Sequence, residues 1–134
     1  MRLLTLIFLL SVSLCGCKQA EKATSTSAKL FQSADIQLQL SPQHIPVETL
    51  LTLSVTASQP VTAVSGSVSG VTMYMGSIPL RFVPDDSNLQ WHAEFLLGAC
   101  SEPAMQWQAD ITIEFADGKK QTIKQTFQSS WTQN

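Results

Sequence analysis

Sulfur side chains are the residues of this 134-residue chain best suited to chemistry. Met73 and Met75 are separated by one residue, so in an extended segment they point to the same side. Cys100 and Met105 lie in a second segment, which glycine and proline interrupt and which we expect to be a loop between strands. Thiolate and thioether sulfurs are soft ligands suited to Cu(I). If the two segments meet at one end of the fold, the sequence predicts a Cu(I) site formed by Met73, Met75, Cys100 and Met105.

A packing role for the same sulfurs is the alternative. Methionine is a flexible apolar filler, and the three methionines could fill gaps around Trp91 and Trp107, with Cys100 as a small buried neighbour. The two histidines do not distinguish a Cu(I) site from a packing role. We expect His92 on the polar face of a strand and His44 in a loop between prolines, although either could join a copper site.

Patterns typical of enzymes and of nucleic-acid binding are missing from the sequence. It contains no Gly-x-Ser-x-Gly, no His-Glu-x-x-His and no glycine-rich phosphate loop, and its carboxylates are scattered singly. Glu102 disfavours a catalytic thiolate at Cys100 through like-charge repulsion. The eight Lys and Arg residues and ten Asp and Glu residues form no basic patch. We therefore expect a non-enzymatic protein with no nucleic-acid partner.

The first residues have the pattern of an export signal. Arg2 precedes an apolar stretch over residues 3–10, which is too short to span a bilayer as a stable helix. Leu14, Gly16 and Cys17 then fit the Leu-x-Gly-Cys pattern, and in this the segment resembles the signal peptides of bacterial lipoproteins. An ordinary cleaved signal or an uncleaved anchor is the alternative.

The lipoprotein resemblance implies removal of residues 1–16 and acylation of Cys17, which anchors the protein to the cell envelope facing the periplasm. Lys18, which would be the second residue of the mature chain, favours the outer over the inner membrane. Because Cys15 leaves with the signal, Cys100 becomes the remaining free thiol in an oxidising compartment, unless it pairs with another chain.

The mature chain is long enough for one domain. Residues 18–29 contain no large apolar side chain, and we expect a lipidated cysteine and flexible tether over residues 17–34. Residues 35–134 alternate between apolar and polar side chains with a period near two, which predicts strands. We expect an all-β, immunoglobulin-like antiparallel β-sandwich of about seven strands, with a small barrel as the competing architecture. The expected strands are centred on residues 36–40, 51–57, 61–71, 78–82, 89–97, 105–115 and 121–127.

Residues 70–127 resemble the YtkA-like and FixH-like group of small exported β-sandwich proteins. The resemblance is carried in order by Met75–Pro79, Trp91–Phe95, Gly98, Trp107 and Asp117–Gly118. It implies an immunoglobulin-like fold and, for several members, a role in copper handling or cytochrome oxidase assembly. In that group the glycine and the next tryptophan lie close together, whereas here residues 99–106 separate them. The segment that carries Cys100 and Met105 is therefore an addition of this chain.

Residues 97–103 are also similar to a segment of small Gram-negative lipoproteins that accompany Sco-type copper chaperones. Together these resemblances predict a membrane-anchored periplasmic lipoprotein that binds or relays Cu(I), with a copper chaperone or an oxidase assembly protein as its partner. The alternative is an interaction or structural module of the envelope with no metal site.

Overall fold

The computed structural model describes residues 26–131, and this part of the chain folds into β-strands without helices. No helix that could cross a membrane occurs among these residues. The strands are β1 (Ala28–Gln32), β2 (Ile36–Ser41), β3 (Leu51–Ala57), β4 (Val61–Gly70), β5 (Ser77–Arg81), β6 (Val83–Pro84), β7 (Gln90–Phe95), β8 (Gln106–Phe115) and β9 (Lys120–Gln128).

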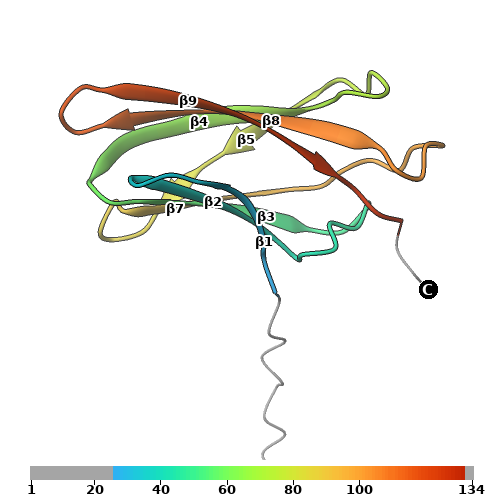
Figure 1. Cartoon of the computed structure of the whole chain (residues 1–134), viewed down its shortest axis with the longest axis horizontal. Helices are drawn as coiled ribbons and strands as arrows, with labels where there is room; N and C mark the ends of the chain where they lie inside the picture. Colours follow the sequence, from blue (N-terminus) through green and yellow to red (C-terminus); the bar gives the residue numbers. More distant parts are fainter. Residues whose placement is uncertain (1–25, 132–134) are drawn as a thin grey trace, which may run out of the picture.

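The strands form two antiparallel sheets that face each other as the layers of a sandwich (Figure 1). One sheet has the order β1-β2-β3-β7-β6, and the other has the order β5-β4-β8-β9. Strands β2-β3-β7-β6 correspond to the A-B-E-D sheet of an immunoglobulin domain, and β4-β8-β9 correspond to its C-F-G sheet. The predicted all-β immunoglobulin-like sandwich is confirmed, with β1 and β6 as strands beyond the expected seven.

The predicted alternation of side chains produces the core. Along β8 every second residue is buried, from Trp107 through Ile111 to Phe115, and β7 buries Trp91, Ala93 and Phe95 in the same way. Because successive side chains of a strand point to opposite faces, each strand supplies one apolar row to the space between the sheets.

The N-terminal boundary of the domain differs from the prediction. Residues 28–32, which we expected in the flexible tether over residues 17–34, form edge strand β1 and pair with β2 from Ala28–Leu40 to Gln32–Gln37. Leu30 and Phe31 of β1 pack against the core, and this apolar burial helps to offset the entropy lost when the strand is ordered. The signal peptide over residues 1–16 and the lipidation site Cys17 lie outside the described residues.

The two ends of the sandwich carry different segments. The loops 42–50, 71–76 and 96–105 and the segment 129–131 lie together at one end, which we call the rim. Backbone hydrogen bonds join its parts: Glu48 N donates to Leu97 O at 2.9 Å, and Ser130 N donates to Ile45 O at 2.9 Å. The turns 33–35, 58–60, 85–89 and 116–119 lie at the opposite end. Both predicted sulfur segments therefore belong to the rim.

Candidate functional site

Two of the predicted sulfurs meet at the rim. The Cys100 thiol donates a hydrogen bond to the thioether sulfur of Met73, and the Sγ–Sδ distance is 3.5 Å. Met73 is 43% exposed and Cys100 is half-buried against the edge of the core. Cys100 forms no disulfide among the described residues, so its thiol is available. The loops 71–76 and 96–105, far apart in the sequence, thus place a thiol and a thioether side by side within reach of solvent.

Met75 extends the contact between the same loops. A Cβ placed on Gly98 would lie 3.7 Å from the Met75 methyl carbon, which is ordinary van der Waals contact. Met75 is 38% exposed. The rim therefore brings Met73 and Met75 from one loop against the loop that carries Cys100, which is the condition that the predicted sulfur site requires.

Glycine at two positions allows loop 71–76 to fold in this way. At Gly70 a Cβ would lie 2.1 Å from the carbonyl oxygen of Met73 and 2.5 Å from the methyl carbon of Met105. A side chain at this position would therefore force the loop away from the end of β4. At Gly76 the backbone has φ of 78°, a left-handed conformation that suits glycine.

Met105, the fourth predicted ligand, lies in a different environment. It is only 1% exposed and continues the inward-facing row of β8. Its sulfur accepts a hydrogen bond from the Thr72 hydroxyl at 3.0 Å, and Thr72 Oγ1 also accepts from Gln106 N at 3.2 Å. The packing role proposed as the alternative therefore describes Met105, while Met73 and Met75 are exposed.

The base of the rim is held by a buried hydrogen-bond network. Ser129, 1% exposed, is the buried polar residue of the described chain. Its hydroxyl accepts from the Trp107 indole nitrogen at 3.0 Å and donates to the Met105 carbonyl oxygen at 3.5 Å, while its backbone nitrogen donates to the same carbonyl at 3.0 Å. This network fixes the start of β8, where loop 96–105 ends.

Replacing Ser129 by alanine is expected to lower the free energy of unfolding by about 1–3 kcal/mol, because the buried Trp107 indole N–H loses its acceptor. Urea unfolding followed by tryptophan fluorescence measures the loss. Ser101→Ala, on an exposed side chain of loop 96–105, is the matched control and should change the stability by less than about 0.5 kcal/mol. Equal stability of the two variants would show that the network contributes nothing.

In the described part of the chain, histidines and carboxylates build no metal-binding group around Cys100. His44 and His92 are both exposed, as the sequence predicts; His44 lies in rim loop 42–50, whereas His92 lies on β7, opposite Ser54. Within residues 26–131 no group of three His, Cys, Asp or Glu residues is arranged to hold a metal ion. A metal site at the rim therefore depends on methionine sulfurs.

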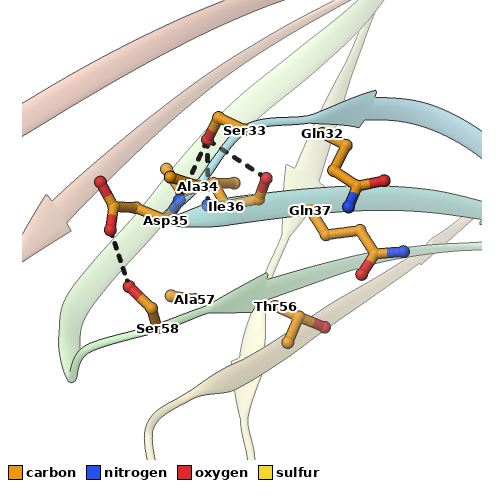
Figure 2. Close-up of a pocket in the computed structure, with 9 residues that line it drawn as sticks. All are labelled: Gln32, Ser33, Ala34, Asp35, Ile36, Gln37, Thr56, Ala57 and Ser58. Carbon is orange, nitrogen blue, oxygen red and sulfur yellow. Dashed lines mark hydrogen bonds between the residues drawn. The ribbon is translucent and has the colours of Figure 1, made fainter.

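A hollow of about 240 Å³ lies at the opposite end, beside the turn between β1 and β2 (Figure 2). Three of its polar residues, Ser33, Asp35 and Ser58, are engaged with one another and with the backbone of the turn. The Ser58 hydroxyl donates to Asp35 at 3.0 Å, and Ser33 Oγ accepts from Ile36 N at 3.1 Å (Figure 2). We assign no function to this hollow, because these hydrogen bonds serve the turn itself.

The chain's sequence matches no family model and none of the curated proteins. Among solved structures, the fold is similar to the crystal structure of a DUF4426 family protein from Pseudomonas aeruginosa PAO1. The match has a TM-score of 0.53 and 16% sequence identity, and it covers 79% of this chain and 98% of the other. At this identity the likeness concerns the all-β fold alone.

Proposed function

We propose that this protein is a non-enzymatic lipoprotein of the bacterial envelope that binds or relays Cu(I) through Cys100, Met73 and Met75. The observation that carries the proposal is the 3.5 Å contact between the Cys100 and Met73 sulfurs on a solvent-accessible rim. A thiolate with two thioethers is a donor set that favours Cu(I) over harder metals.

The spacing of the sulfurs is compatible with a shared ion. Two sulfurs each bound at about 2.3 Å in trigonal or tetrahedral geometry lie roughly 3.8–4.0 Å apart. The Cys100–Met73 pair is a few tenths of an ångström closer, so side-chain rotation alone could admit the ion. Met75, on the same loop and beside Gly98, is the third donor, and we omit Met105 because it is buried and its sulfur already accepts a hydrogen bond.

Anchoring and partners follow from the sequence. The Leu-x-Gly-Cys pattern supports acylation at Cys17 and a position facing the periplasm, on the outer rather than the inner membrane because of Lys18. The resemblance to YtkA-like and FixH-like proteins supports a role in copper handling or cytochrome oxidase assembly. A copper chaperone or an oxidase assembly protein is the partner that this role requires.

Competitive Cu(I) titration under reducing conditions tests the proposal. The wild-type domain is expected to take up about one Cu(I) per chain. Cys100→Ser should weaken Cu(I) binding about a hundredfold or more, and Met73→Leu about tenfold, because each removes a soft donor.

Met105→Leu is the matched control, since it removes a buried methionine of nearly the same volume. It should leave Cu(I) affinity unchanged once circular dichroism shows that the variant is folded. An affinity unaffected by Cys100→Ser would refute the copper site. A loss with Met105→Leu equal to that with Met73→Leu would place the ion deeper than proposed.

A second function, docking of another protein without metal, is favoured by the exposed apolar side chains of the rim. Thiol labelling of the native protein separates the two proposals. With a metal site, Cu(I) should protect Cys100 from modification, and a Cu(I) chelator should restore the rate. Labelling that is indifferent to Cu(I) would favour the docking module.

A further inference from the structure

The rim is the apolar end of the domain. Seven of the eight large apolar side chains that are exposed in the described part of the chain lie in its loops, and Val83 on β6 is the exception. They include Tyr74 at 86% exposure, Leu96 at 53% and Trp131 at 52%, and the set is completed by Leu50, Val71, Met73 and Met75. Such a concentration of apolar side chains at one end is typical of a surface that a membrane or another protein covers.

The rim carries fewer charged side chains than the turns at the opposite end of the domain. The rim segments contain Glu48 and Glu102 and no Lys or Arg. The turns of the other end carry Asp35, Asp85, Asp86, Asp117 and Lys119. There the Ser87 hydroxyl holds the pKa of Asp85 below its ordinary value, and Lys119 does the same for the pKa of Asp117, so both carboxylates stay ionised. The domain therefore has one end suited to water and one suited to an apolar interface.

The chain enters the domain at the apolar end. Thr26, the first described residue, accepts a backbone hydrogen bond from Gln43 of the rim at 2.7 Å, and the first residue of β1 pairs with Leu40. Only residues 18–25 separate Thr26 from Cys17, a span of at most about 30 Å when fully extended. An acyl anchor on Cys17 would thus draw the rim, rather than the charged end, toward the bilayer.

We propose that the rim is a membrane-docking face, which lays Tyr74, Leu96 and Trp131 into the headgroup region of the phospholipid bilayer that holds the anchor. This inference rests on the lipid anchoring in the proposed function. Tyrosine and tryptophan have an apolar body and a polar tip and accumulate at the bilayer interface. Docking places the Cys100 and Met73 sulfurs at the level of the lipid headgroups and leaves the charged end facing the periplasm.

Tryptophan fluorescence of the acylated full-length mature protein tests the docking. The protein is reconstituted in phosphatidylethanolamine–phosphatidylglycerol vesicles, with and without brominated acyl chains. Trp91 and Trp107 are buried in the core, so the exposed Trp131 reports on the rim. We expect brominated lipid to quench the part of the emission that comes from Trp131, and this quenching should be missing in the Trp131→Phe variant. Iodide dissolved in the water should quench Trp131 less in the vesicle-bound protein than in the protein free in solution.

Two matched variants locate the docking face. Leu96→Asp on the rim should abolish the quenching by brominated lipid, whereas Val83→Asp, an equally exposed position on β6, should leave it unchanged. Equal effects of the two variants would overturn the proposal. Quenching of Trp131 by iodide in an acylated, vesicle-bound protein would also overturn the proposal. The same result is expected if the rim binds a protein partner instead of the bilayer.

Failure of the proposed function would give experimental results that differ from those of failed docking. An unacylated Cys17, seen by mass spectrometry of the N-terminal peptide, would remove both the anchor and the docking. Loss of the Cu(I) site alone would appear in the titration and would leave the quenching of Trp131 intact.

Discussion

Replacing Cys17, the proposed lipidation site, by serine is expected to abolish acylation of the protein completely and to detach its domain from the proposed lipid anchor. The physical reason is that each buried methylene contributes about 0.8 kcal/mol, so several acyl chains hold a protein at the membrane essentially permanently, whereas a short apolar segment does not. Incorporation of alkyne-palmitate in cells and flotation of the purified protein with vesicles measure the effect.

Cys100→Ser is the matched control for this experiment, because it removes a cysteine without touching the Leu-x-Gly-Cys pattern. It should be acylated and float like the wild type. Acylation of the Cys17→Ser variant would contradict the proposed lipidation site. A wild-type protein that begins before residue 17 would instead indicate an uncleaved anchor.

Truncating Trp107 to alanine is expected to lower the free energy of unfolding by about 3–5 kcal/mol, a large share of the 5–15 kcal/mol typical of a domain. Trp107 is 1% exposed, pairs with Gly70 on β4 and with Phe127 on β9, and donates its indole N–H to Ser129. The variant therefore loses core packing and also the hydrogen bond that fixes the base of the rim. Chemical denaturation followed by circular dichroism gives the change.

Trp131→Ala is the control for the loss of an indole ring, since Trp131 lies at the rim and is 52% exposed. It should change the stability by less than about 0.5 kcal/mol. If both substitutions had the same effect, the burial and the hydrogen bond of Trp107 would contribute no more to stability than the exposed Trp131 does.

The strands that the sequence predicts best are those buried on one face. In β7 and β8 the strict alternation of apolar and polar residues identifies both the strand and its inward face, because the side-chain period of a strand matches the sequence pattern. Strands β1 and β6 escaped prediction for a related reason. Strand β1 is a half-buried edge strand, and β6 is two residues long and exposed, so neither shows a clear alternation.

The candidate site was predictable in part. The sulfur-bearing loops follow from glycine and proline positions, and their meeting was a condition that the sequence left open. The burial of Met105 was also visible in advance, since Met105 has the same parity as Trp107 and Ala109 in the β8 row. No comparable pattern marks Thr72, Leu96 or Trp131, because isolated side chains in loops have no periodicity to reveal which way they point.

The sequence by itself determined the all-β class, the inward rows of the long strands and the candidate sulfurs. The tertiary structure alone decided that Cys100 lies against Met73, that Met105 is withdrawn into the core, and that the chain enters beside the apolar rim. Alternation is a local property that each strand expresses wherever it packs. Contacts between loops depend instead on strand order and on the closure of two sheets, which bring together residues that no short stretch of sequence contains.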